Sequence, residues 1–251
     1  MIDIFSKIDS DRFGIKIGRT DWNTFKDNPI EVFNTLTNDE YDLIIARLDM
    51  NNVKSVNTME DLGFRIKDHQ ITYKFDLNST DIEYKSRNTK YITRDFKEPD
   101  IDRIVEISRE SFDGYGHYFA NESLNRDRCR EIYPDWAYNI CTNPNISDKI
   151  IVAEDNGIAI GYLSFKIYED GDYKYAAGGV GTVDVKYRGN DIFPDLIVAG
   201  LEWGKEIGLD WEEHNVIVNN FPVNRSMNKI GFKPSNPITT MHYTKITLNN
   251  E

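Results

Sequence analysis

The order of hydrophobic and polar positions predicts strands and helices throughout the first third of the chain. In some segments hydrophobic and polar residues alternate, as in a strand, and in one segment the hydrophobic residues recur with the period of a helix. The predicted elements are strands at 14–20 and 42–48, a helix near 29–38, and a hairpin of 70–77 and 80–86 around Leu77-Asn78-Ser79. The polar stretch 85–90 that follows predicts a domain boundary.

The rest of the chain continues with longer elements. Asp155-Asn156-Gly157 predicts a tight hairpin turn, and Gly208 ends an amphipathic helix. The predicted elements are a strand from Tyr91-Ile92-Thr93-Arg94, helices near 98–110 and 122–142, strands 149–154, 159–168 and about 174–185, a helix of about 191–207, a strand 214–219, a helix 222–229, and strands near 232–235 and 239–247. This order predicts a mixed α/β fold with a mixed sheet.

One short pattern occurs twice without a gap. Asn-Asn-x6-Met-x2-[Leu/Ile]-Gly-Phe spans residues 51–64 and 219–232. In each copy a strand leads into the asparagines, a short helix follows, and Gly-Phe ends the helix and begins the next strand. We therefore predict that 42–77 and 209–247 form the same strand-helix-strand unit by duplication. The alternative is convergent use of residues that end helices.

Composition narrows the class of protein. The 251 residues carry a formal net charge of −12, which disfavours nucleic-acid binding because phosphate neutralisation needs excess Lys and Arg. A hydrophobic share of 39% suits a folded chain. Cys129 and Cys141 have no histidine at ligand spacing, so we expect buried thiols and no metal. The start of the chain has no basic leader or long apolar run, and we expect a cytoplasmic protein away from membranes.

The segment 178–193 carries the strongest indication of chemistry. A strand with three glycines, Gly178, Gly179 and Gly181, leads through a turn to a helix beginning near Ile192. Glycines weaken a strand, so we expect another molecule to approach its backbone closely. A turn that opens onto a helix N-terminus suits a pyrophosphate. A tight strand-to-helix turn with a surface arginine is the structural alternative.

These motifs resemble the GNAT superfamily of acyl-CoA-dependent N-acyltransferases. The resemblance covers about 91–248 and rests on Val183-Asp184-Val185-Lys186-Tyr187-Arg188-Gly189 and on Asn220-x2-Val223…Ile230-Gly231-Phe232. The stretches 9–19 and 111–139 further resemble the group that includes dTDP-fucosamine N-acetyltransferase, in which a partial GNAT-like domain precedes the full one. The resemblance implies a partial domain at 1–88 and an N-acyltransferase domain at 89–251.

The chain departs from the family pattern at several positions. Asp191 stands where the loop has glycine, Phe193 replaces a small residue, and Pro194 removes one N–H from the helix start. We expect the Asp191 carboxylate to turn toward solvent as an acid of the first helical turn. Met227 stands where the family often has a tyrosine that protonates the leaving thiolate. A thiolate already leaves readily at neutral pH, so water can replace that acid.

The resemblance also implies site residues for direct attack of an amine on a thioester. The backbone of Thr182 and Val183 would polarise the carbonyl and hold the pantetheine. The candidate proton acceptors are Asp184, His117 and His242, whereas His69 and His214 receive no role. The implied acyl-CoA contacts are Thr182, Val183, Val185, Arg188, Gly189, Asn190, Asp191, Ile192, Phe193 and Asn220. The implied acceptor contacts are Phe112, Tyr115, His117, Tyr118 and Trp136, with a loop packed by aromatic side chains as the alternative.

The resulting hypothesis is a nucleotide-sugar N-acyltransferase. It would move an acetyl or longer acyl group, such as 3-hydroxybutyryl, from acyl-CoA to a dTDP-linked amino-dideoxyhexose for surface polysaccharide or antigen synthesis; Gly178, Gly179 and Gly181 would leave room for either group. Two alternatives remain, namely a GNAT acting on a protein N-terminus or small amine, and a catalytically silent CoA-binding module. The position of the amine, the acyl length and the oligomeric state, including a homodimer, stay open.

Overall fold

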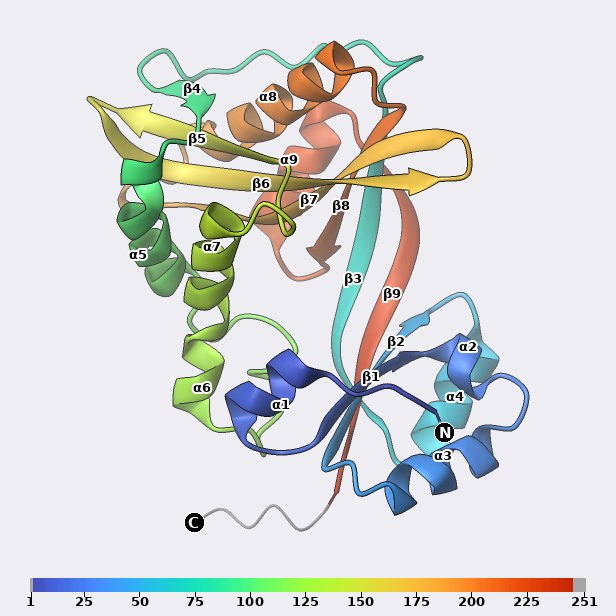
Figure 1. The fold of residues 1–251 in the computed structure, drawn as a ribbon. Helices are drawn as coiled ribbons and strands as arrows, with labels where there is room; N and C mark the ends of the chain where they lie inside the picture. Colours follow the sequence, from blue (N-terminus) through green and yellow to red (C-terminus); the bar gives the residue numbers. More distant parts are fainter. Residues whose placement is uncertain (1, 246–251) are drawn as a thin grey trace. The chain divides into compact units, whose positions relative to one another are not determined.

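The computed structural model describes residues 2–245 and divides them between two compact units (Figure 1). Unit 1 comprises the described parts of Met1–Ile71, Gly114–Cys129 and Asn236–Glu251, and unit 2 comprises Thr72–Asp113 and Arg130–Ser235. Helices and sheet occur in both units, which confirms the mixed α/β class. The predicted division into a partial domain at 1–88 and an acyltransferase domain at 89–251 groups the chain differently from these units, and it stays a prediction.

Unit 1 is built on the strand order β1-β2-β9-β3. Its elements are α1 (Lys7–Phe13), β1 (Ile17–Asp21), α2 (Trp22–Phe25), α3 (Pro29–Asn38), β2 (Leu43–Asp49), α4 (Val53–Asp61), the first part of β3 (Arg65–Asp76), most of α6 (Arg126–Arg130), and most of β9 (Lys233–Thr244). Strand β1 pairs with β2 in parallel, and β2 pairs with β9 antiparallel. The helix predicted near 29–38 and the strand predicted at 42–48 are confirmed.

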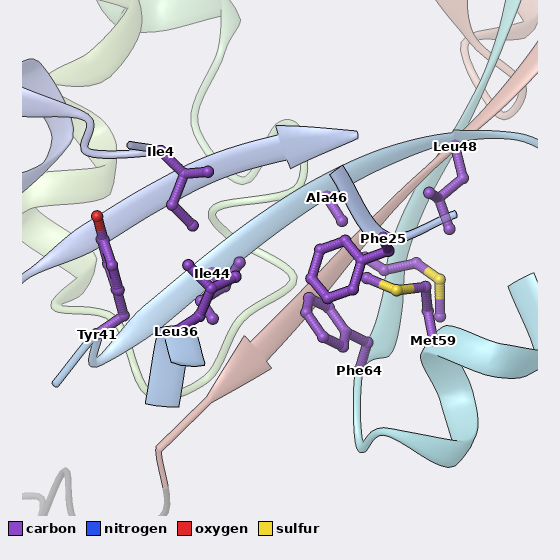
Figure 2. Packing of buried hydrophobic residues seen from close by; sticks show 10 residues of the cluster. Ile4, Phe25, Leu36, Tyr41, Ile44, Ala46, Leu48, Met59 and Phe64 are labelled. Carbon is purple, nitrogen blue, oxygen red and sulfur yellow. The ribbon is translucent and has the colours of Figure 1, made fainter. Parts of the chain in front are cut away.

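The core of unit 1 gathers around aromatic side chains from several elements (Figure 2). Phe25, Phe64 and Met59 are fully buried, and the rings of Phe25 and Phe64 meet edge to face at 6.0 Å between centroids. Burial of such large apolar side chains contributes about 2–3 kcal/mol each. The repeated Met and Phe of the first sequence copy therefore serve packing.

Unit 2 is built on the strand order β3-β8-β7-β6-β5-β4. Its further elements are β4 (Ile92–Asp95), the short 3-10 helix η1 (Glu98–Asp100), α5 (Ile101–Ser111), α7 (Ile132–Thr142), β5 (Lys149–Asp155), β6 (Ile158–Asp170), β7 (Tyr173–Val183), the 3-10 helix η2 (Val185–Tyr187), α8 (Ile192–Glu206), β8 (Trp211–Ile217) and α9 (Phe221–Ile230). Strands β4 to β7 are antiparallel neighbours, and β7 pairs with β8 in parallel.

Helices cover both faces of this sheet. Tyr162 of β6 packs in one cluster with side chains of α5 and α7. Phe165 lies an odd number of residues further along β6, so it points to the opposite face. There it meets α8, where a Cβ added to Gly200 would lie 2.3 Å from its ring. The sheet of unit 2 is thus buried between α5 and α7 on one face and α8 on the other (Figure 1).

The two sequence copies form the same unit, as predicted. Strand β2, helix α4 and strand β3 follow in the first copy, and β8, α9 and β9 follow in the second. Asn52 and Asn220 cap the two helices, each accepting a hydrogen bond from the backbone N–H three residues later, at 3.1 and 3.4 Å. Such caps satisfy a donor that the first helical turn leaves open.

The ends of the two helices also match. The N–H of Phe64 donates to the carbonyl of Met59, and that of Phe232 to Met227, each at 3.0 Å. The glycine before each phenylalanine is left-handed, with φ of 90° and 107°. Met59 and Met227 lie within helices and are buried. Met59 in a strand, or Gly63 inside a helix, would have contradicted the repeat. In the described copies Met59 lies in α4 and Gly63 follows its end.

Each repeat completes the sheet of the other. In unit 1, β2 of the first copy pairs with β9 of the second. In unit 2, β8 of the second copy has β3 of the first as its neighbour. Strands β3 and β9 each contribute residues to both units.

Three sequence predictions of elements are wrong. Residues 80–86 form no strand, because Asp76 accepts the N–H groups of Asn78 and Ser79 and ends β3 there. The helix predicted for 122–142 is two helices, α6 and α7, since Pro134 cannot donate to residue 130. The two strands predicted near the C-terminus are the single strand β9; residues 246–247 lie outside the described part.

Within residues 2–245, no helix is long and apolar enough to cross a membrane. Cys129 is buried and Cys141 is half-buried, both as free thiols, and burial raises the pKa of Cys141 to about 12. The described residues hold no group of three or more His, Cys, Asp or Glu suited to a metal ion.

Candidate functional site

Strands β7 and β8 part at a defined point, called the fork below. Their parallel register runs from Tyr175 with Trp211 to Gly178 with His214 and ends there. Both strands continue, β7 to Val183 and β8 to Ile217. The β8-facing edge of β7 beyond Gly178 therefore has no strand partner in the described part of the chain. Two carbonyls of this stretch accept side-chain hydrogen bonds, Val180 from Ser164 and Val183 from Arg188, each at 3.0 Å. Thr182 and Val183 lie in this stretch.

A bulge accompanies the fork. Leu163 pairs with Gly181 and Phe165 with Gly178, so Ser164 faces two residues of β7, Gly179 and Val180. A bulge adds twist and re-aims the backbone, which fits a strand leaving its neighbour.

The expected reason for the three strand glycines is wrong in this structure. A Cβ on Gly178 would lie 2.0 Å from the His214 ring, one on Gly179 2.5 Å from Ser164 Oγ, and one on Gly181 2.5 Å from Leu163. The glycines make room for the chain's own side chains. They therefore do not provide the free space for acyl groups that the sequence suggested.

Asp184 closes the turn after β7. Its carboxylate forms an ion pair with Arg103 of α5 and accepts the N–H of Lys186 at 2.9 Å, and its side chain is 1% exposed. Because these partners hold the carboxylate, Asp184 fixes the turn. A role as the reacting base stays a prediction.

Asp191 takes a backbone conformation that glycine adopts more readily than other residues. It has φ of 57° and ψ of 14°, a left-handed conformation that aspartate tolerates better than most residues. Its carboxylate accepts hydrogen bonds from Arg87 Nε at 2.9 Å and Lys229 Nζ at 3.0 Å. The hydrogen bond from Arg87 is the main cause that lowers the Asp191 pKa well below its usual range. The expectation that Asp191 faces solvent is wrong, since its side chain is 11% exposed.

A basic pocket of about 410 Å³ opens at the start of α8. Four cationic side chains and one carboxylate line it, which is unusual in a chain with a net charge of −12. The lining residues are Lys85, Arg87, Asp191, Pro194, Arg225, Ser226 and Lys229. The first N–H groups of a helix have no intrahelical acceptor and add partial positive charge at this end. Pocket and helix start together suit phosphate groups.

The other predicted acyl-CoA contacts surround the same turn. Gly189 and Asn190 are exposed and Asn190 donates to the Tyr187 carbonyl at 2.9 Å. Arg188 donates from Nε to the carbonyl of Val183 at 3.0 Å. Of the remainder, Val185 is exposed, Ile192 is buried, Phe193 is half-buried and Asn220 caps α9. Val185 to Phe193 adjoin the start of α8 and Asn220 lies at the start of α9; their contact with acyl-CoA stays a prediction.

Two predicted acceptor residues share an aromatic stack in unit 2. Phe112 stacks on Tyr133 with centroids 4.2 Å apart, and Tyr133 stacks on Trp136 at 6.1 Å. Trp136 is 42% exposed. A partly exposed stack offers a flat apolar face to a ring.

The remaining predicted residues lie in unit 1. His117 Nδ1 and His242 Nε2 are 2.9 Å apart, and Asn121 contacts His242 Nδ1 at 3.0 Å. Burial lowers the pKa of His117 well below its usual range and that of His242 to about 3. Both rings are therefore neutral near pH 7 and weak as proton acceptors.

The Tyr118 hydroxyl is already hydrogen-bonded to residues of the same unit. Its hydroxyl donates to Asp9 at 2.6 Å, and Arg19 contacts both side chains. Burial opposes ionisation of Asp9, but the hydrogen bond and charge of Arg19, together with the hydrogen bonds from Ser6 and Tyr118, outweigh it and lower the Asp9 pKa. Tyr115 is half-buried in the same segment.

Sequence reasoning missed the pocket cations. Lys85 and Arg87 fall in the stretch 85–90, which was interpreted as a boundary, and Arg225 and Lys229 lie on α9. The available indication was local: positive charges gathered in these two segments of an acidic chain. Nothing in the sequence showed that the two segments meet.

Comparisons with known proteins give a clear result at the level of fold. No protein-family model matches the chain, and no curated protein matches it in sequence. A GCN5-related N-acetyltransferase from Sphaerobacter thermophilus matches with a TM-score of 0.56 and 14% identity over 80% of this chain. This chain spans only 59% of that protein's chain.

Two further solved structures are similar. A tandem GNAT protein from the clavulanic acid biosynthesis pathway has a TM-score of 0.58 and 14% identity, covering 88% of this chain and 69% of its own. A GCN5-related glucosamine N-acetyltransferase region of a fungal multi-domain GH3 beta-N-acetylglucosaminidase has a TM-score of 0.55 and 16% identity, covering 85% and 27%. The chain therefore has the fold of these GNAT structures.

Proposed function

We propose that the chain is an N-acyltransferase that moves an acyl group from acyl-CoA to a primary amine. The observation that carries this proposal is the basic pocket at the start of α8, which lies one turn beyond the parted strand β7. Phosphates of the co-substrate would occupy the pocket, because four cations and the helix start face it. The unpaired edge of β7 would bind the amide-bearing arm and the thioester oxygen through backbone groups.

The finer proposal concerns the acceptor. We infer a dTDP-linked amino-dideoxyhexose, in keeping with the sequence resemblance and a role in surface polysaccharide or antigen synthesis. The stack of Phe112, Tyr133 and Trp136 suits a base or sugar ring. One similar structure is a glucosamine N-acetyltransferase region, so an amino-sugar acceptor has a precedent on this fold.

Release of free CoA thiol tests both levels. The protein is mixed with acetyl-CoA and, separately, with dTDP-4-amino-4,6-dideoxyhexoses, glucosamine and a peptide with a free N-terminus. We expect release with the dTDP-amino sugars at least tenfold faster than with the other amines. Faster release with the peptide or with glucosamine would support the acyltransferase proposal and contradict the proposal of a nucleotide-sugar acceptor. No thiol release with any amine, together with tight CoA binding, would instead indicate a silent CoA-binding module.

A further inference from the structure

A buried carboxylate and imidazole form a pair on β8. Glu212 and His214 are two residues apart and point to the same face of the sheet. His214 Nε2 and Glu212 Oε1 are 2.7 Å apart, and the two residues are 5% and 0% exposed. Burial raises the pKa of Glu212. Its second oxygen, Oε2, is buried and has no hydrogen-bond partner within the described chain. Burying a carboxylate with one unpaired oxygen costs folding free energy. We therefore expect a functional reason for this pair.

The other edge of the imidazole lies at the fork. Gly178 and His214 are the last residues of the β7–β8 register. A Cβ on Gly178 would lie 2.0 Å from His214 Nδ1, so Nδ1 rests directly against the backbone of β7. Glycine at 178 is the residue that allows this approach. Nε2 thus faces the carboxylate, while Nδ1 faces the point where β7 loses its partner.

Packing holds the ring in this orientation. Phe165 and Phe232 meet it edge to face, with centroids 6.1 and 5.4 Å away. The described contacts of the pair include Phe165 of β6, Gly178 of β7, Gly200 of α8 and Phe232 before β9, none of which titrates. On β3, the other neighbour of β8, Tyr73 is buried and its hydroxyl donates to Asn224 Oδ1 at 3.0 Å.

We propose that His214 is the proton acceptor of the acyl-transfer reaction and that Glu212 is its positioning residue. This inference rests on the proposed function. When the Glu212 carboxylate accepts the Nε2 proton, it fixes the tautomer with the lone pair on Nδ1. The carboxylate also stabilises the imidazolium that forms when Nδ1 takes a proton.

The step balances with the groups named. The lone pair of the neutral amine forms a C–N bond to the thioester carbon, and the carbonyl π pair moves to oxygen. The ammonium proton of this adduct passes to Nδ1, directly or through one water. The electron pair on oxygen then re-forms the C=O bond as the C–S bond breaks with its electron pair on sulfur, and the thiolate takes the proton from the imidazolium. The products are an amide and CoA thiol, and the pair returns to its starting state.

Kinetics of matched variants provide the first test. His214→Gln, Glu212→Gln and the control His69→Gln are assayed with acetyl-CoA and a dTDP-4-amino-4,6-dideoxyhexose. We expect His214→Gln to lower kcat by about 100-fold or more, as for loss of a general base, with the KM for acetyl-CoA within about threefold. Glu212→Gln should lower kcat less and change the pH at which the wild-type rate rises, because the imidazole loses its neighbouring carboxylate. His69→Gln should behave as the wild type.

The outcomes separate the two proposals. A wild type without acyl transfer to any amine overturns the proposed function and this inference together. An active wild type with a folded His214→Gln variant that keeps a third or more of kcat overturns only the inference. If His214→Gln does not fold, the pH dependence of kcat in Glu212→Gln decides instead. A pH dependence identical to that of the wild type would overturn the inference.

Imidazole NMR provides a readout that needs no turnover. The chain has four histidines, so nitrogen-15 signals can be assigned by single His→Gln variants. We expect His214 to carry its proton on Nε2 in the wild type near pH 8 and to lose this preference in Glu212→Gln. A proton held on Nδ1 across pH 6–9 would overturn the assignment, since Nδ1 would then have no lone pair to offer.

Discussion

At the scale of single residues, Asp191 partly neutralises the positive charge of the pocket. Its carboxylate engages Arg87 and Lys229, two of the four cations that line the cavity. Under the proposed function, a phosphate group that enters the pocket would compete with this carboxylate for both cations. The backbone at Asp191 is left-handed, a conformation that asparagine and aspartate adopt more readily than other side chains except glycine.

Asp191→Asn should therefore strengthen acetyl-CoA binding. Asparagine keeps the backbone conformation and removes the competing charge, so we expect Kd to fall about three- to tenfold at low salt and less at high salt. Arg225→Ala should raise Kd by a similar factor. Calorimetric titration at two salt concentrations measures both, with Arg109→Ala, an exposed cation outside the pocket, as the control. Equal affinities in all four proteins would place phosphate binding elsewhere.

The paired histidines of unit 1 make stability depend on pH. Burial lowers the pKa of His242 to about 3, with the Lys67 and Arg19 charges adding to the effect. His117 is shifted in the same direction, by burial and then by the charges of His242, Arg47 and Arg19. The unfolded chain binds protons near pH 6.5, so it holds more protons than the folded chain between that pH and about 3. Stability is thus fully present above pH 6.5 and declines as the pH falls.

We expect the free energy of unfolding to drop by about 2 kcal/mol for His242 alone between pH 7.5 and pH 5. Urea unfolding at the two pH values measures this change, and the His242→Gln variant should lose much of it. The lowered pKa of Asp9 acts only below its unfolded value near 3.8, outside this window. His69→Gln provides the control. The same pH dependence in His242→Gln and the wild type would contradict the argument.

At the scale of elements, local chemistry made most of the fold predictable. Asn52 and Asn220 start helices, and Gly63 and Gly231 end them, through hydrogen bonds that reach only a few residues. The sequence therefore located α4 and α9 and their repeat. The turn at Asn156-Gly157 is equally local, with both residues at positive φ.

Elements whose partners are distant in sequence were mispredicted. The alternating residues 80–86 have the pattern of a strand, but β3 finds its neighbours in β8 and β9, more than 130 residues further on. The N–H of Leu77 donates to the carbonyl of Asp210, which directs the chain away from a hairpin. The basic pocket and the Glu212–His214 pair also depend on contacts between segments that are distant in sequence, so local patterns did not predict them. His214 received no role because its position against Gly178 depends on strand register, which no local pattern gives.

At the scale of the whole molecule, the two repeats depend on each other. Residues 65–71 of β3 belong to unit 1 and residues 72–76 to unit 2, while β9 passes from unit 2 to unit 1 after residue 235. Neither sequence repeat therefore contains all the strands of one unit. The segment 89–251, which the sequence predicts to be the acyltransferase domain, lacks both the β3 neighbour of β8 and the β2 partner of β9.

The fragment 89–251 should consequently fail to fold alone. Without β3 and β2 it would expose unpaired strand edges, which favour aggregation, and we expect no cooperative urea transition. The full chain should unfold in one transition that coincides by circular dichroism and by tryptophan fluorescence, because Trp22 lies in unit 1 and Trp203 in unit 2. Co-expression with residues 1–88 is the matched control and should restore a soluble complex with the unfolding curve of the intact protein. A soluble 89–251 fragment that unfolds cooperatively and binds acetyl-CoA would contradict this dependence, and would support the sequence-based division at residue 88 instead.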